Sequence, residues 1–362
     1  MLVLHVGPHK TATTWLQHNF YHNIKALEQA GWYYPQTGVR VRVAHHDLSD
    51  NPAQIFDRDS TTVRELKKIA AKAAENNLNI LLSSEGFRNW KPDHLTQLQA
   101  IMAPHELHIV YCVRDPVSML YSFWAQQVRT GTQLSFPEFS DKQFARPTRS
   151  KILNPLTEIK ALQAVEGAKL TILLYDEIRR QKRDIFDVFV KDILNIAPLP
   201  HSEDARANER EPIEMTEFMR LVLIRIGSWK EDADVNIGRV FHYMLPRSKE
   251  EKIVGSVSAV EGAKRIAVID REQLIFDKVE LKLLKKYRSF MVPQPQGNRL
   301  FLDGPEECPY YDGALLEADP AVSRLLDNVA NTFRPGGLHI WVMNWSRFWL
   351  SLYRRIMKVL RG

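Results

Sequence analysis

The sequence predicts an α/β fold in which a parallel β-sheet is flanked by helices, with a mainly helical extension in the C-terminal part. The first observation is that short apolar runs alternate with helical patterns through the first half of the 362-residue chain. The second is that these runs are continuous, as strands are when both faces of a parallel sheet are covered. The third is that polar clusters follow the runs directly, and ligands bind at the carboxyl ends of parallel strands.

Four apolar runs have the length of buried strands, and helical patterns separate them. The expected strands are 2–6, 78–82, 107–113 and 170–174. The expected helices, in chain order, are 15–27, 61–76, 92–103, 116–128, 151–165, 184–194, 212–229 and 271–287. We expect residues 33–60 to be a loop because the stretch is polar and contains Pro35, Gly38 and Pro52, and residues 293–320 to be loop-rich because they contain five prolines and several glycines.

The turn after the first strand has the composition of an anion site. Gly7 ends the strand, and the chain then enters a helix through His9, Lys10, Thr11, Ala12, Thr13 and Thr14. Free backbone N–H groups and the positive helix end make such a turn a binding site for phosphate. The lysine adds a positive charge and the threonines add hydroxyl donors. The alternative is an ordinary strand-to-helix turn with solvated threonines.

The spacing in this turn differs from the P-loop of the nucleotide triphosphatases. That pattern requires Gly-Lys-Ser/Thr after a glycine and four residues, and those positions here hold Ala12, Thr13 and Thr14. The spacing Gly-x-x-Lys-Thr-x-Thr-Thr instead resembles the 5′-phosphosulfate loop of sulfotransferases, of the bacterial and carbohydrate-acting type, that use 3′-phosphoadenosine-5′-phosphosulfate (PAPS). The family usually has glycine at the position of Ala12, so a left-handed backbone there would be strained.

A second motif closes the strand 107–113. Arg114 follows the strand, and Ser122 stands eight residues later on the expected helix. A guanidinium and a hydroxyl can hold one phosphate together. The segment YCVRDPVSMLYS resembles the 3′-phosphate motif of sulfotransferases, in which Arg and Ser recur at this separation, and the segment 174–177 is a weaker match to the family's acidic strand end. Alone, Arg114 could equally form a surface ion pair with Asp115 or another carboxylate.

The resemblance implies a P-loop-like sulfotransferase fold with PAPS as cosubstrate, 3′,5′-ADP as product and no metal. It implies that Lys10 neutralises the leaving phosphate oxygen, that the loop from Gly7 to Thr14 holds the 5′-phosphate, and that Arg114 and Ser122 hold the 3′-phosphate. By family analogy, the acceptor is expected to be a hydroxyl or amine of a carbohydrate or glycolipid. Residues 1–225 would form the α/β core with the PAPS site, and 226–337 would contribute to the acceptor site.

The acceptor needs a general base, for which two candidates stand out. Glu85 follows the second strand and would lie beside the cosubstrate cleft, where partial burial would raise its pKa toward the working pH. His45 or His46 is the other candidate, because histidine titrates near neutrality. Glu85 is slightly favoured. The alternatives are that Glu85 caps the next segment or pairs with Arg88 or Arg114, and that both histidines are solvated.

Residues 338–362 form the last expected region, an amphipathic helix. Its aromatic and aliphatic residues fall on one face at helical spacing, and its basic residues, which include Arg347, Arg354, Arg355, Lys358 and Arg361, fall on the other. Such a helix suits an anionic membrane surface. Docking of the apolar stripe on its own domain or on a dimer partner is an equal alternative.

Composition limits the remaining function classes. The 49 basic and 43 acidic residues give a net charge of +6, which suits an anionic cosubstrate but is too small to indicate a nucleic-acid partner. Cys112 and Cys308 are too few for a disulfide framework or a cysteine zinc site. Without a signal-like start or a spanning apolar run, a cytoplasmic enzyme is expected, peripheral to the membrane if the tail binds lipid. The alternatives are a nucleotide or nucleoside kinase on the same fold, and a non-catalytic phosphonucleotide-binding, membrane-associated protein; the oligomeric state is not indicated.

Overall fold

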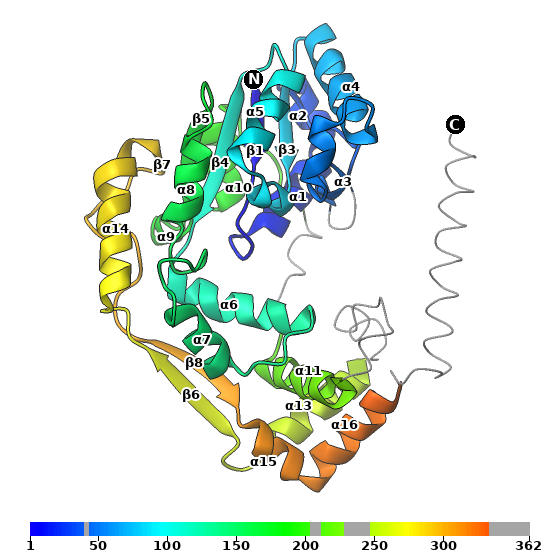
Figure 1. Ribbon diagram of the computed structural model, residues 1–362, viewed down its shortest axis with the longest axis vertical. Coiled ribbons are helices and arrows are strands. Elements are labelled where there is room, and N and C mark those ends of the chain that lie inside the picture. The colour runs from blue at the N-terminus through cyan, green and yellow to red at the C-terminus, as the bar shows by residue number, and fades with distance from the viewer. Residues whose placement is uncertain (40–42, 203–210, 228–246, 333–362) are drawn as a thin grey trace. The chain divides into compact units, whose positions relative to one another are not determined.

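The computed structural model describes residues 1–39, 43–202, 211–227 and 247–332, and Figure 1 shows its helices and strands. The chain forms two compact units, each made of three segments. The first comprises Met1–Leu120, Gln143–Glu209 and Asp270–Glu306, and the second Tyr121–Lys142, Arg210–Ile269 and Glu307–Gly362. The division at residues 225 and 337 expected from the sequence stays a prediction, and the expected helix 338–362 lies outside the described residues.

The first unit contains a six-stranded sheet in the order β2-β3-β1-β4-β5-β7, and every neighbouring pair of strands is parallel. This confirms the α/β fold class. The strands are β1 Leu2–His5, β2 Trp32–Tyr33, β3 Asn79–Ser83, β4 Leu107–Val113, β5 Lys169–Leu174 and β7 Met291–Val292. The long strands are buried throughout, apart from single residues at their starts.

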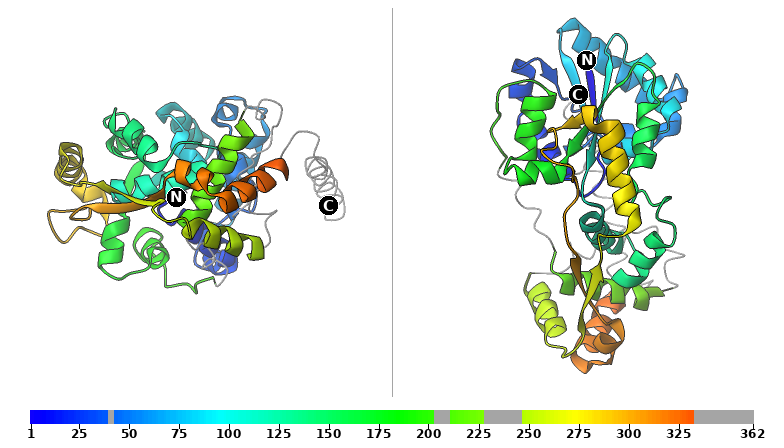
Figure 2. Two further views of the ribbon diagram at one scale, coloured as in Figure 1. Left: turned by 90° about the horizontal axis from the view of Figure 1, so that it is seen from below. Right: turned by 90° about the vertical axis from the view of Figure 1, so that its left-hand side faces the viewer.

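Successive side chains of each strand point to opposite faces of the sheet, and each face has its own apolar core. One face is formed by residues such as Leu4, Leu82 and Ile109 and packs against α4, α5, α8 and α14. The other, which includes Val3 and Cys112, packs against α1 and α10. Figure 2 shows helices of this unit on both sides of the sheet. Such two-sided burial is the reason that the strands are continuous apolar runs.

Short connections and helices complete the first unit. Its α-helices are α1 Thr13–His22, α2 Ile24–Gln29, α3 His46–Ser49, α4 Thr61–Glu75, α5 Pro92–Ile101, α8 Leu156–Gln163, α9 Tyr175–Arg180, α10 Ile185–Val188 and α14 Leu274–Tyr287. Shorter 3₁₀ or π turns span Pro52–Phe56, Glu85–Asn89, Phe189–Ile193 and Arg288–Phe290.

After β1 the chain continues toward β2 and β3, whereas after β4 it continues toward β5. The strand order therefore reverses between β1 and β4, which is where open α/β sheets bind ligands.

The second unit is mainly helical. It contains α11 Ile213–Ile226, α13 Arg247–Ser258, α15 Gly313–Ala318, α16 Pro320–Thr332 and a two-stranded sheet of β6 Lys264–Ile269 and β8 Glu306–Tyr311. Helices α6 Pro116–Arg129 and α7 Phe136–Phe144 contain residues of both units. Among the described residues, no helix is long and apolar enough to cross a bilayer. Both cysteines are buried, and neither forms a disulfide within the described part of the chain.

Several sequence expectations were wrong in detail. The expected loops hold regular structure: α3 lies within 33–60, and β8 and α15 lie within 293–320. Strands β2 and β7 were missed because two residues carry no periodic signal, and β6 was missed because it lacks a continuous apolar run. The helix expected over 15–27 is interrupted at Asn23, whose side-chain amide donates to the carbonyls of Asn19 and Pro200.

A buried ion pair fixes the turn that follows β3. The Nε of Arg88 donates to both carboxylate oxygens of Glu158, at 2.7 and 2.8 Å, and Tyr111 Oη donates to the same carboxylate at 2.8 Å. The exposed fractions of the Arg88 and Glu158 side chains are 10% and 6%. Arg88 is thus committed to Glu158, and the alternative in which it pairs with Glu85 is wrong.

Replacing Arg88 by methionine should lower the free energy of unfolding by roughly 3 kcal/mol, because it leaves the buried Glu158 carboxylate without its main partner. The matched control is Lys68→Met, which breaks the exposed Lys68–Glu65 pair and should cost under about 1 kcal/mol. Urea unfolding followed by circular dichroism measures both. Equal stability of the two variants would contradict the role given to the buried pair.

Candidate functional site

The turn after β1 and the end of β4 lie against each other at the reversal of the strand order. The Cys112 N–H donates to the Gly7 carbonyl at 2.8 Å. The Nη1 of Arg114 donates to the Lys10 carbonyl at 2.5 Å. The two motifs that the sequence separates by about a hundred residues therefore touch.

The loop after β1 has an unusual backbone. Lys10 and Ala12 both have positive φ angles, of 67° and 59°, and Ala12 is the N-cap of α1 in the left-handed conformation. This matches the conformation anticipated for Ala12. Non-glycine residues in this region are strained by about 1–3 kcal/mol each and persist only where their surroundings hold them.

Glu85 holds this loop in place. Its carboxylate, 7% exposed, accepts hydrogen bonds from the Thr13 hydroxyl and from Gln17 Nε2, the latter at 3.1 Å. His9 Nδ1 lies 3.6 Å from the same carboxylate. Three side chains from the loop and α1 thus converge on one carboxylate at the end of β3. Sequence reasoning missed Gln17, although its position one helical turn after Thr13 places both on one face.

The pKa of Glu85 shifts in the direction opposite to the one expected. Burial alone would raise the pKa of this carboxyl, but the interaction with His9 and the hydrogen bonds from Thr13 and Gln17 outweigh burial and hold the pKa well below its ordinary value. A carboxylate stabilised in this way is a weak base. Its place in the structure is that of an anchor for the loop.

The start of α1 is left open toward an anion. No side chain caps this helix N-terminus, and the first N–H groups of a helix have no partner within it. The Thr11 hydroxyl donates to the Pro8 carbonyl at 2.7 Å and Thr13 donates to Glu85, so both protons are directed into the protein. Thr14 is half-buried, and within the described part of the chain its hydroxyl makes no hydrogen bond.

Arg114 keeps donor capacity for a ligand. Its Nε is buried and has no hydrogen-bond partner among the described residues. Its guanidinium carbon lies 5.0 Å from the centre of the Tyr175 ring, at the end of β5. An orphaned guanidinium donor beside an uncapped helix start fits a ligand with two anionic groups. Ser122 is half-buried on α6 and belongs to the second unit, so its expected partnership with Arg114 stays a prediction.

The two histidines are placed differently. His45 is fully buried, its Nε2 lies 2.8 Å from the Pro35 carbonyl and its Nδ1 accepts the Ser83 N–H at 3.1 Å. Burial lowers the pKa of His45 to about 4. His46 is half-buried, and its Nδ1 lies 3.1 Å from the hydroxyl of Ser84, the residue before Glu85. Of the two histidines, His46 is the one that is not fully buried.

Comparison with protein-family models identifies the family of the chain. A model of the sulfotransferase domain matches residues 2–196, more than half of the chain. The chain belongs to the sulfotransferase family. No curated protein and no solved structure matches it. In this sulfotransferase, the matched range contains both motifs but ends before α14, β7 and the remainder of the segment 270–306.

One group of side chains among the described residues has the spacing of metal ligands. Ligand atoms of Asp184, Asp187 and His201 lie within 4.8 Å of one another. Each has a structural partner: Asp184 accepts from Trp15 Nε1 and caps α10 through the Phe186 N–H, and Asp187 pairs with His201 at 2.8 Å. These contacts explain the group without an ion.

Glu85→Gln should make the loop less stable at neutral pH but not in acid. Because the folded-state pKa of Glu85 is lowered, its carboxylate contributes stability above about pH 5, and this contribution is lost as the pH falls. The variant should lose roughly 1–3 kcal/mol at pH 7, and its difference from the wild-type protein should shrink toward pH 3. Thermal unfolding across pH 3–7 measures this. A difference that stays constant over this range would contradict the lowered pKa.

Proposed function

We propose that this sulfotransferase moves a sulfuryl group from PAPS to a hydroxyl or amine of a carbohydrate or glycolipid. The observation that carries the proposal is the contact between Arg114 and the Lys10 carbonyl, since it brings the loop suited to the 5′-phosphosulfate to the cation suited to the 3′-phosphate. The acceptor class rests on the resemblance to carbohydrate sulfotransferases.

The chain's own groups would divide the work as follows. The N–H groups at the start of α1, with the Thr14 hydroxyl, would bind the 5′-phosphate, and Arg114 with Ser122 would bind the 3′-phosphate. Lys10 would neutralise the charge that develops on the leaving phosphate oxygen. PAPS supplies the sulfuryl group, and 3′,5′-ADP is the leaving group. Thr11, Thr13 and His9 would shape the loop from within.

His46 is the base that the contacts favour. The Ser49 hydroxyl donates to the His46 carbonyl at 3.3 Å and lies 2.8 Å from the Ser84 hydroxyl. Because the Ser49 hydroxyl donates its proton to this carbonyl, it can only accept from the Ser84 hydroxyl. The Ser84 oxygen then accepts a hydrogen bond from His46 Nδ1–H. His46 Nε2 then carries the lone pair that accepts the acceptor's proton. Glu85 and His45, by contrast, are buried and hydrogen-bonded within the protein.

The two rivals differ in what they bind. A kinase on this fold would need the Walker lysine and a magnesium carboxylate, and the loop has neither at the required spacing. A non-catalytic phosphonucleotide-binding protein would keep the site without the chemistry. A cytoplasmic location with peripheral membrane contact through residues 338–362 accompanies the proposal and would place a glycolipid acceptor within reach.

Thermal unfolding with nucleotides tests the cosubstrate. The chain should be stabilised by 3′,5′-ADP and not by ATP with magnesium, because only the former carries a 3′-phosphate for Arg114. Transfer from labelled PAPS to a panel of glycans should then fall by orders of magnitude in Lys10→Ala, with 3′,5′-ADP binding retained. Stabilisation by ATP with magnesium alone would favour the kinase. Binding of 3′,5′-ADP without transfer to any acceptor would favour the non-catalytic protein.

A split in kinetic constants tests the base. His46→Ala should lower kcat by about 10²–10⁴-fold with little change in the KM for PAPS, and should remove the acidic limb of the pH–rate profile. Glu85→Gln should mainly raise the KM for PAPS, because it loosens the loop. His45→Ala serves as the neighbouring comparison. Loss of the acidic limb in Glu85→Gln and not in His46→Ala would return the role of base to Glu85.

A further inference from the structure

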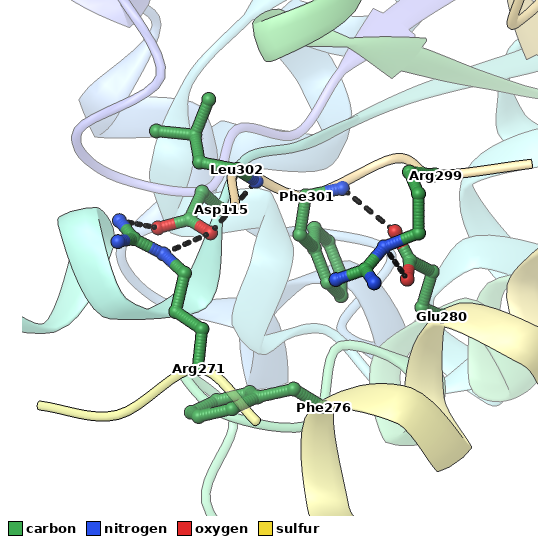
Figure 3. A pocket seen from close by; sticks show the side chains of 7 residues that line it. All are labelled: Asp115, Arg271, Phe276, Glu280, Arg299, Phe301 and Leu302. Carbon is green, nitrogen blue, oxygen red and sulfur yellow. Dashed lines mark hydrogen bonds and ion pairs between the residues drawn. The ribbon is translucent and has the colours of Figure 1, made fainter. Parts of the chain in front are cut away.

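Arg271 is a buried cation that lies outside the residues matched by the family model. Its side chain is 5% exposed. It donates to both carboxylate oxygens of Asp115, from Nε at 3.2 Å and from Nη2 at 3.0 Å, and also to the Gly304 carbonyl at 3.0 Å and to the Glu306 carboxylate. Figure 3 shows the Arg271 and Asp115 side chains joined directly by hydrogen bonds, among the residues that line a small pocket. The sequence separation of 156 residues makes this a long-range tie.

Asp115 needs such a partner because of where it lies. It follows Arg114 directly and is fully buried. Its N–H donates to the Asp176 carboxylate at 2.5 Å, so two carboxylates lie beside the phosphate-binding arginine. Burial first, and then the charge of Asp115, raise the pKa of Asp176 to about 6, against the opposing effects of the Asp115 N–H and Arg114. The raised pKa reflects the crowding of negative charge at this strand end.

An uncompensated carboxylate at this place would compete with the ligand for Arg114. A buried anion without a counter-ion is strongly unfavourable, and the residue that precedes Asp115 in the chain, Arg114, carries a guanidinium. If Arg114 formed an ion pair with Asp115, its unpaired Nε would donate to Asp115 and would not be available to a ligand. A negative charge at this strand end would in addition repel a phosphate.

We propose that Arg271 is a positioning residue for cosubstrate recognition: it neutralises Asp115 and so keeps Arg114 available for the 3′-phosphate. The inference rests on the proposed function, because it assigns a ligand to Arg114. The same carboxylate accepts the Ser118 N–H at 2.8 Å at the start of α6, so the pair also fixes the first turn of the helix that carries Ser122. The segment 270–306 thereby becomes part of the nucleotide site without touching the nucleotide.

The test compares the binding of 3′,5′-ADP and 5′-AMP to the full chain by calorimetry, since the two ligands differ by the 3′-phosphate. Arg271→Gln should reduce the preference for 3′,5′-ADP by at least about tenfold, as expected for the loss of a hydrogen bond to a charged group, while the Kd for 5′-AMP changes little. The double variant Asp115→Asn/Arg271→Gln should regain most of the preference. Asparagine still caps α6, and the charge that required Arg271 is gone.

Arg299→Gln is the matched control. Arg299 pairs with Glu280 at 2.9 Å in the same segment but makes no contact with Asp115 among the described residues, so its loss should leave the preference unchanged. A full preference in Arg271→Gln, or a preference that stays low in the double variant, would overturn the proposal. If Arg271→Gln does not fold, as judged by circular dichroism, the double variant decides the matter: it must fold and show most of the wild-type preference, or the proposal fails. A wild-type protein without preference for 3′,5′-ADP would instead contradict the proposed function.

Discussion

Charge balance at the carboxyl ends of β3, β4 and β5 determines what this edge of the sheet can bind. Three buried carboxylates, those of Glu85, Asp115 and Asp176, lie where the proposed ligand carries its own negative charges. Each carboxylate accepts hydrogen bonds from different donors. Glu85 accepts from the loop and α1, Asp115 from Arg271, and Asp176 from the Asp115 N–H. Because the Glu85 and Asp115 carboxylates are paired inside the protein, Arg114 and the open end of α1 retain their positive potential for an anion.

The strained loop and its anchor depend on each other. Two left-handed non-glycine residues would not hold their conformation in an isolated turn. The buried Glu85 carboxylate ties both sides of the loop, through His9 before the strained residue Ala12 and through Thr13 and Gln17 after it. The carboxylate is in turn kept ionised by these same donors. Anchoring and catalysis make opposite demands on a carboxylate, because a good anchor has a low pKa and a good base a raised one. This explains why a glutamate in the expected place serves as an anchor.

Local sequence determined the features that could be predicted. The bounds expected for β4 match the structure, those of β1 and β5 differ by one residue at one end, and β3 is shifted by one residue at both ends. The agreement is close because a run buried on both faces is continuous in the sequence. The two anion motifs were found because each lies within a dozen residues. The direction of the Glu85 pKa was predicted wrongly because its donors come from a segment about seventy residues away. Strand β7 and the Arg271–Asp115 pair could not be predicted from local sequence patterns. Both involve the segment 270–306, which belongs to the first unit but follows residues 210–269 of the second unit in the chain.

Under this proposal, the site around Arg114 depends on a residue beyond the range that the family model matches. The motif around Arg114 is complete within twelve residues, yet it includes a carboxylate whose burial creates a requirement elsewhere. Arg271, from the segment 270–306, meets that requirement without involving Arg114. An arginine suits this position better than a lysine, because its planar guanidinium carries several donors. Arg271 binds both oxygens of Asp115, the Gly304 carbonyl and the Glu306 carboxylate at the same time. The need for Arg271 thus follows from the charge at position 115. A neutral residue there would make no such demand on the segment 270–306.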